Sequence, residues 1–219
     1  IYGIDINQFP AHLSVINLVV QNPVVKVDKI NVIVSDFFDI KPGYITLSGF
    51  EGITTEGEKT TVKIPAAFDA VIGNPPYIRQ ELLGDTEKKI IIELIEHEYN
   101  RKLYVGTTPG LKNNDAVILD KQSDIYIYFF LHGLAFLRNG GDLGFITSNK
   151  WLEVGYGEPF QKFLLNNVKL KYIIEFDRAI FPDAEVNTAI TILEKEKDPD
   201  KRRNNSVKFV RLKQKMGIK

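Results

Sequence analysis

The stretch of residues 68–77 constrains this chain most. It opens with a short apolar run, and a glycine separates that run from the sequence Asn74-Pro75-Pro76-Tyr77. A short apolar run of this kind is typical of a buried parallel strand. Two successive prolines fix two φ angles, remove two backbone donors and keep Asn74 out of the α region. The pattern therefore predicts a buried strand whose stiff tip presents a polar amide beside an aromatic ring.

The groups at this strand tip suit one kind of ligand. An exocyclic amino group on a planar base can donate its two N–H groups to the Asn74 side-chain oxygen and the Pro75 carbonyl, while Tyr77 stacks on the ring. These hydrogen bonds draw the nitrogen lone pair out of conjugation and make it nucleophilic. The alternative is a tight Asn-Pro turn with Tyr77 as ordinary packing. The preceding apolar strand favours the functional interpretation, because a motif counts only in its structural context.

Residues 68–77, Phe-Asp-Ala-Val-Ile-Gly-Asn-Pro-Pro-Tyr, resemble motif IV of the amino-group methyltransferases that use S-adenosylmethionine. The neighbouring segments most resemble the N6-adenine DNA methyltransferases of restriction–modification systems, including the fused type IIG enzymes. The resemblance implies a class I, Rossmann-like α/β fold with a mostly parallel sheet, and S-adenosylmethionine as cofactor without a metal. It implies catalytic roles for Asn74, Pro75, Pro76 and Tyr77, with Asn74 also at the cofactor.

The same resemblance implies DNA as partner, with a restriction or specificity domain or subunit as a further one. The tetrapeptide also occurs in RNA methyltransferases and in the glutamine methyltransferases of release factors. Methyl transfer to RNA or to a protein glutamine therefore remains open, as does a non-catalytic module that binds DNA or a partner.

The composition is that of an ordinary globular domain, with 44% hydrophobic and 26% charged residues in 219. No apolar run reaches the length of a membrane span, and the beginning lacks a signal pattern. Cysteine is absent, which excludes disulfides and thiolate metal ligands. We expect a reducing cytoplasm as the location.

The formal net charge is zero, which argues mildly against a nucleic-acid-binding surface spread over the whole domain. Basic residues are nonetheless concentrated near the end: residues 201–219 contain eight Lys and Arg and no acidic residue. Such a segment can meet phosphate groups. It can equally be a solvated tail.

Residues 1–20 predict a strand, an acidic residue and a helix. Asp5 follows the apolar strand, and apolar positions recur at helical spacing in residues 8–20. In doubly wound folds, an acid at this place hydrogen-bonds the ribose hydroxyls, although an N-cap or loop acid is the alternative. The resemblance to motif II implies that Asp5 binds the cofactor ribose and that Ile6 packs on its adenine.

Residues 30–34 predict the next strand, and Asp36 and Phe37 follow it closely. An acid at a strand end can accept an adenine amino group, and the aromatic ring beside it offers a flat packing surface. Taken alone, the pair is more typical of a loop. The resemblance to motif III implies that Asp36 binds the cofactor N6 and that Phe37 lies beside the ring.

The middle of the chain predicts elements without an assigned function. Residues 41–63 are rich in Gly and polar residues and predict a loop or small hairpin. Residues 85–103 predict a helix rich in Glu and Lys. Residues 104–121 predict a long irregular loop, which could close over a flipped base.

Residues 123–138 predict an apolar helix with Ser123 as N-cap. Residues 139–141, Asn-Gly-Gly, predict the end of this helix, and residues 142–147 predict the following strand. Together they resemble motifs V and VI. The resemblance implies that Phe129 packs against the cofactor adenine, whereas an ordinary core aromatic is the alternative.

The segment after residue 147 predicts a turn, a helix and two strands. The turn resembles the Ser-Asn-Lys-Trp turn of the family, and the alternation in the last strand favours an edge or antiparallel position. In chain order, these elements are residues 148–151, 158–167, 172–176 and 187–193.

Phe181 and Pro182 lie between the last two predicted strands and resemble motif VIII. In the family, the aromatic of this motif faces the tyrosine of motif IV across the target base. The resemblance implies that Phe181 and Tyr77 enclose the adenine, and Phe176 is the alternative to Phe181.

Three predicted strand ends carry Asp5, Asp36 and Asn74, and we expect them to converge at the carboxyl edge of the sheet, where open α/β folds bind ligands. An adenine inside a duplex cannot reach such an edge, so the target base would be flipped out. No covalent nucleophile is required.

The resemblance predicts a partial methyltransferase catalytic domain in residues 1–195. A basic segment, residues 196–219, then leads toward a target-recognition domain. The first strand of the family and its glycine-rich loop are not found in this sequence. We therefore expect a piece of a longer protein, inactive alone, whose incomplete sheet leaves the strands of Asp5 and Asn74 facing a gap. A rearranged or swapped assembly is the alternative.

Overall fold

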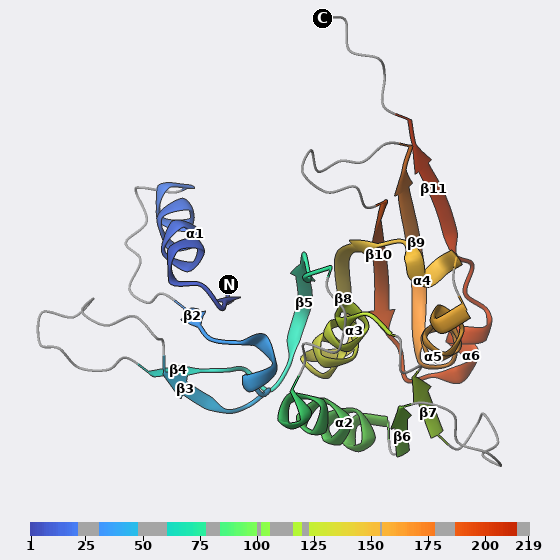
Figure 1. The fold of residues 1–219 in the computed structure, drawn as a ribbon, viewed down its shortest axis with the longest axis horizontal. Helices are drawn as coiled ribbons and strands as arrows, with labels where there is room; N and C mark the ends of the chain where they lie inside the picture. Colours follow the sequence, from blue (N-terminus) through green and yellow to red (C-terminus); the bar gives the residue numbers. More distant parts are fainter. Residues whose placement is uncertain are drawn as a thin grey trace, which may run out of the picture. The chain divides into compact units, whose positions relative to one another are not determined.

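In the computed structural model (Figure 1), the chain forms two compact units, unit 1 (Ile1–Ala66) and unit 2 (Ala67–Lys219). The span that we expected to form one catalytic domain, residues 1–195, is thus divided after residue 66. The structure describes residues 1–21, 31–47, 61–77, 84–99, 102–105, 116–119, 123–153, 155–177 and 187–213.

Unit 1 begins with a strand, a helix and a second strand. β1 (Gly3–Asp5) pairs in parallel with β2 (Val32–Val34), and α1 (Gln8–Gln21) lies between them in sequence. Ala11 on α1 and Val32 on β2 form a small buried core. The predicted strand–acid–helix order is confirmed, and the part of the predicted second strand that is described is residues 31–34.

The rest of unit 1 contains a short 3-10 helix and a pair of strands. The helix η1 (Phe37–Asp39) follows Asp36. β3 (Ile45–Leu47) and β4 (Thr61–Lys63) pair antiparallel, in agreement with the hairpin alternative for residues 41–63. Gly43 has φ +80° at the turn before β3, which glycine adopts without strain.

Unit 2 is organised around a five-stranded sheet with the order β11-β9-β10-β8-β5. Only β10 runs antiparallel to its neighbours, so the carboxyl ends of the other four strands share one edge. The mostly parallel sheet expected from the sequence is confirmed. The last predicted strand is indeed antiparallel, but it lies inside the sheet and not at its edge. The strands are β5 (Phe68–Gly73), β8 (Leu137–Ser148), β9 (Val168–Phe176), β10 (Thr188–Lys195) and β11 (Lys208–Leu212).

Buried aromatic side chains join the helices of unit 2 to its sheet. The Phe130 ring lies 5.1 Å from the Phe145 ring and 5.3 Å from the Phe160 ring, and Trp151 meets Phe160 edge-on at 5.3 Å. These rings fix the carboxyl part of β8 against two helices. The helical elements are α2 (Asp85–Tyr99), α3 (Ile125–Ala135), α4 (Lys150–Glu153), η3 (Gly155–Gly157), α5 (Glu158–Asn167) and α6 (Pro199–Arg203).

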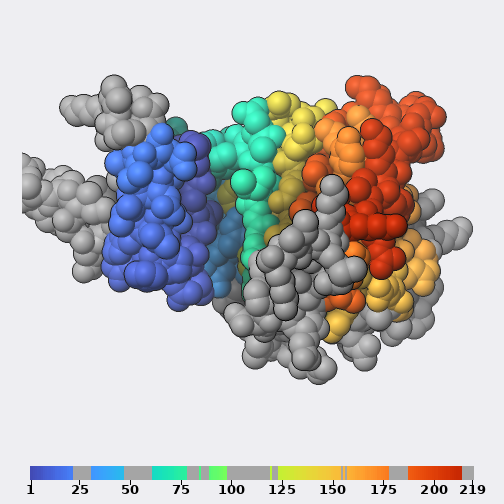
Figure 2. Space-filling view, turned by 90° about the horizontal axis from the view of Figure 1, so that it is seen from above, coloured from blue at the N-terminus to red at the C-terminus, as the bar shows by residue number. Residues whose placement is uncertain are grey.

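The strand before Asn74 is exposed, which contradicts its predicted burial and agrees with the expectation that this strand faces a gap in the sheet. β5 does pair in parallel with β8, but it is the last strand of the sheet within the described residues. Its neighbour covers one side only, and Ile72 is 84% exposed. Figure 2 shows this turquoise part of the chain at the surface.

The predicted junction between the apolar helix and the next strand also needs correction. α3 ends at Ala135, and β8 begins at Leu137, so the Asn-Gly-Gly sequence lies within the strand. Gly140 has φ +76°, and the pairing with β5 shifts its register here. A Cβ on Gly141 would lie 3.0–3.1 Å from three backbone oxygens. The glycines therefore form an irregularity in the strand, and they do not end the helix. The N-cap residue of α3 is Asp124, not Ser123.

Two further segments contain more strand than the sequence predicted. The helix expected in residues 85–103 ends at Tyr99, and β6 (Lys102–Val105) begins within that expected range and continues into the expected loop. β6 pairs in parallel with β7 (Ala116–Leu119), which lies inside the expected loop. Near the end of the chain, β11 pairs with β9. The boundary expected after residue 195 therefore cuts through the five-stranded sheet.

Candidate functional site

The stiff tip after β5 is present and lies at the carboxyl edge of the sheet in unit 2. Asn74 and Pro76 are exposed, Pro75 is buried, and Tyr77 is half-buried. Gly73 allows this end of β5 to approach β8, because a Cβ there would lie 3.2 Å from the Phe145 ring. The tip thus combines an anchored backbone with an accessible amide.

The Tyr77 hydroxyl connects the tip to β8. It lies 2.7 Å from the Asn74 side-chain oxygen Oδ1 and 3.4 Å from the backbone oxygen of Ile146. Burial raises the pKa of the Tyr77 phenol above its ordinary value. The hydroxyl is therefore protonated at neutral pH and available as a donor. The sequence predicted a role for the ring of this tyrosine, but not this hydrogen bond.

Asn149, which follows β8, is a second polar group at this edge. Its side-chain nitrogen donates to Glu153 Oε1 at 3.0 Å and to Glu175 Oε1 at 3.3 Å. Its backbone N–H donates to the Asn187 oxygen at 3.0 Å. Asn149 is buried and fixes the turn after β8 to β9 and to the beginning of β10. The Ser-Asn-Lys-Trp pattern indicated a turn here without indicating these contacts.

In unit 1, Asp5 and Asp36 lie at the carboxyl ends of two neighbouring parallel strands. The Asp5 Oδ1 accepts from Asn7 N at 2.8 Å, and the Asp36 Oδ1 accepts from Phe38 N at 2.9 Å, which caps η1. A hydrogen bond of 3.0 Å from Ser35 N to the Asp5 backbone oxygen joins the two strand ends. The sequence predicted this juxtaposition correctly.

The groups at this edge of unit 1 fit a nucleoside. Each carboxylate uses Oδ1 locally, so within the described residues its Oδ2 is available to accept from hydroxyl or amino groups. Ile6 is 63% exposed beside Asp5, and Phe37 is half-buried beside Asp36. An exposed apolar side chain and an aromatic ring beside two acceptors suit a planar base and its ribose.

A protein-family model described as Eco57I restriction-modification methylase matches residues 1–181. The chain belongs to this family. The type II methyltransferase M.BstVI of Geobacillus stearothermophilus is 37% identical over 121 residues, which are 55% of this chain and 18% of that protein. The chain therefore spans less than a fifth of the length of M.BstVI.

Three solved structures share the fold. The methyltransferase subunit of a type I restriction-modification system from Streptococcus thermophilus has a TM-score of 0.59 at 19% identity, over 96% of this chain and 35% of that one. DrdV in a DrdV–DNA complex has a TM-score of 0.59 at 16% identity, over 96% of this chain and 21% of that one. A third structure, described as a class I S-adenosylmethionine-dependent methyltransferase from Listeria monocytogenes, has a TM-score of 0.57 at 16% identity, over 97% of this chain and 48% of that one. The class I methyltransferase fold is thereby confirmed.

The remaining predicted site residues are the aromatic ones. Phe129 is half-buried on α3, whereas most residues around it on that helix are buried. Phe176 ends β9 and is half-buried. Phe181 and Pro182 lie outside the described residues. The roles of these aromatics and the convergence of Asp5 and Asp36 with Asn74 stay predictions.

Among the residues that the structure describes, no group of three or more His, Cys, Asp or Glu residues could hold a metal ion. No helix in the same ranges is long and apolar enough to cross a membrane.

Proposed function

We propose that this chain belongs to an enzyme that transfers a methyl group from S-adenosylmethionine to the N6 amino group of adenine in DNA, as part of a restriction–modification system. The observation that carries the proposal is the exposed Asn74 amide at the rigid end of β5, beside Pro75 and Tyr77. Membership of the restriction-modification methylase family supports DNA as the partner. We include a restriction or specificity domain or subunit in the proposal as a further partner.

The proposed role of the tip is to bind and activate the amino group. The two N–H groups of the amine donate to Asn74 Oδ1 and to the Pro75 carbonyl, which leaves the nitrogen lone pair free to attack. The Tyr77 ring stacks on one face of the flipped-out base and Phe181 on the other. Stacking contributes about 1–3 kcal/mol per base, which offsets part of the cost of flipping.

The proposed cofactor site lies on unit 1. S-adenosylmethionine supplies an activated methyl group when it is bound. Asp5 accepts from its ribose hydroxyls and Asp36 from its adenine amino group. Ile6 and Phe37 pack beside the adenine, and we assign Phe129 to the same ring. The Oδ2 oxygens of Asp5 and Asp36, which have no partner among the described residues, and the exposed Ile6 support this assignment.

The test uses the full-length parent protein, because this chain spans only part of its relatives. We expect the wild type to form N6-methyladenine in DNA, measured by mass spectrometry. Asn74→Ala removes the amide that holds the amino group, so the rate should fall at least about 100-fold, as for other groups that act on the transition state.

Asn166→Ala is the matched control, because Asn166 is an exposed asparagine on α5. We expect this variant to keep the wild-type rate, and both variants to keep the melting temperature. A folded, cofactor-binding parent that makes no N6-methyladenine would overturn the proposal. N4-methylcytosine in its place would keep the role of Asn74 and change the base.

A further inference from the structure

The Asn74 side chain has more freedom than the backbone that carries it. The two prolines after it fix the chain, but its own two side-chain torsions can rotate, and the last one is broad and roughly two-fold. A half turn about that torsion exchanges the oxygen acceptor for the NH2 donor. Only the oxygen can accept from a substrate amino group, so the orientation of this amide matters for the reaction proposed above.

One contact fixes the orientation of the amide within the described residues, the hydrogen bond with the Tyr77 hydroxyl. Its length of 2.7 Å is the usual length for an O–H donor and an oxygen acceptor. The second oxygen near the hydroxyl, that of Ile146, is 3.4 Å away, which is long for such a bond. A phenol donates one hydrogen only, and of these two oxygens the shorter distance makes Asn74 Oδ1 the acceptor.

This assignment leaves the amide oxygen able to bind substrate. A carbonyl oxygen has two lone pairs, and the Tyr77 hydroxyl uses one of them. The second lone pair can accept from the amino group of a base. In the opposite orientation the phenol oxygen would accept from the amide NH2, and of the two oxygens near the hydroxyl only that of Ile146, 3.4 Å away, could then take the phenol hydrogen. The hydrogen bond of 2.7 Å therefore stabilises the orientation with the amide oxygen toward Tyr77.

We propose that the Tyr77 hydroxyl is a positioning group for methyl transfer, which holds Asn74 in the orientation that accepts the substrate amino group. This inference rests on the proposed function of the same tip. The Tyr77 ring and its hydroxyl then have separate roles: the ring stacks on the base, and the hydroxyl acts through Asn74. Tyr77 is half-buried, and its hydroxyl lies 3.4 Å from the backbone oxygen of Ile146 on β8.

The test separates the two roles with Tyr77→Phe in the full-length protein, because phenylalanine keeps the stacking ring. We expect kcat to fall about 2- to 10-fold, the size of one neutral hydrogen bond, with KM for DNA and Kd for the cofactor unchanged. Tyr172→Phe is the matched control, since Tyr172 is a half-buried tyrosine on β9 of the same sheet. We expect its kcat to equal that of the wild type.

A second measurement shows whether the hydroxyl acts through Asn74. In Asn74→Asp, either oxygen of the carboxylate can accept, so a half turn no longer removes the acceptor. Tyr77→Phe should then lower kcat less than about 2-fold in that background. An equal loss in both backgrounds would contradict action through Asn74.

The outcomes distinguish this inference from the proposed function. A wild-type protein that forms N6-methyladenine, together with an unchanged kcat in Tyr77→Phe, overturns the positioning role alone. A change confined to KM also overturns it, because the hydroxyl would then act in ground-state binding. A wild-type protein without methyltransferase activity overturns the proposed function itself.

Discussion

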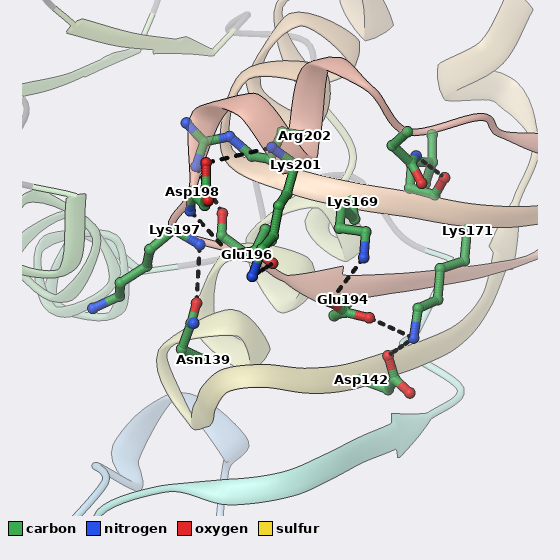
Figure 3. Close-up of polar contacts among 12 residues, drawn as sticks. Asn139, Asp142, Lys169, Lys171, Glu194, Glu196, Lys197, Asp198, Lys201 and Arg202 are labelled. Carbon is green, nitrogen blue, oxygen red and sulfur yellow. Dashed lines mark hydrogen bonds and ion pairs between the residues drawn. The ribbon is translucent and has the colours of Figure 1, made fainter.

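Unit 2 contains two polar regions that differ in how many partners their groups have. At the tip after β5, the Asn74 amide is exposed, and among the described residues its side chain bonds only the Tyr77 hydroxyl. In the second region, charged side chains on three neighbouring strands pair with one another (Figure 3). This ion-pair cluster consists of Asp142 on β8, Lys169 and Lys171 on β9, and Glu194 on β10.

The ion-pair cluster satisfies its charges internally. Lys171 Nζ lies 2.7 Å from Asp142 Oδ1 and 2.7 Å from Glu194 Oε2, and Lys169 Nζ lies 3.2 Å from Glu194 Oε1. Burial alone would lower the pKa of Lys171, but its hydrogen bonds and the charges of Asp142 and Glu194 raise it. The hydrogen bond from Lys171 lowers the pKa of Glu194 against the opposing effect of burial.

A buried lysine next to the cluster has a similar role. Lys195 Nζ donates to the backbone oxygens of Leu134 and Leu137, at 2.9 and 2.8 Å, where α3 leads into β8. Figure 3 shows the neighbouring contact between Asn139 and Lys197, whose backbone N–H donates to Asn139 Oδ1. Groups with complete partners stabilise the fold, whereas the tip leaves acceptor capacity for a ligand.

The largest effect on stability is expected for Lys195→Met, which removes a charged donor from a buried group whose partners are complete. Methionine keeps much of the buried volume but leaves two backbone oxygens without the charged donor. We expect a loss of about 3 kcal/mol in the free energy of unfolding, measured by thermal or denaturant unfolding of the full-length protein. The kcat of the folded enzyme should not change. Lys197→Met is the control, because the exposed Lys197 bonds Asn139 through its backbone.

If Lys195→Met lowered kcat at a temperature where the protein is folded, the paired polar groups would contribute to the reaction and not to stability alone. If it left stability unchanged, the paired polar groups would not be the stabilising ones. Either result would remove the distinction between the two regions.

A smaller effect is expected for Glu194→Gln, which removes one charge from the ion-pair cluster. We expect a loss of about 1 kcal/mol at neutral pH, near the upper end for partly exposed pairs. The pKa of Glu194 is lower in the folded state than in the unfolded state. The contribution of Glu194 to the free energy of unfolding is therefore present above its unfolded pKa, and it is lost as the pH falls through the lower folded pKa.

Lys171 determines the high pH at which the ion-pair cluster stops contributing to the free energy of unfolding. Its folded pKa is raised, so its share is present below the unfolded pKa and is lost as the pH rises through the folded value. Unfolding measured across pH should show the difference between wild type and Glu194→Gln as a plateau that shrinks at both ends. A difference that does not depend on pH would mean that the cluster stabilises by packing and not by charge.

The sequence predicted the parts of this fold that depend on local pattern. Apolar runs that end in polar residues located the strand ends of Asp5, Asp36 and Asn74, because strand and turn preferences act over a few residues. Helical spacing located α1 and α5 for the same reason. The strand ends in turn indicated the candidate site, since carboxyl ends of parallel strands share one edge.

The sequence did not predict features that depend on pairing between distant segments. An apolar run shows that a strand is suitable for burial, but it does not show which neighbours cover it, and Ile72 on β5 is exposed. The sequence analysis interpreted the basic residues near the end as a segment that meets phosphate or as a solvated tail. It did not predict β11, which pairs with β9. The Tyr77 hydroxyl bond depends on side-chain rotamers, which the order of residues does not specify.

The smallest expected effect concerns Arg138 and Asp69, an ion pair outside the cluster. Arg138 Nε lies 2.6 Å from Asp69 Oδ1, as close as the pairs in the cluster, but the side chains are 54% and 86% exposed. Solvent screens an exposed pair, so Arg138→Gln should change the free energy of unfolding by less than about 0.5 kcal/mol. Added salt should reduce the effect of Arg138→Gln proportionally more than that of Glu194→Gln. Equal losses from both variants would mean that distance, and not burial, decides the strength of these pairs.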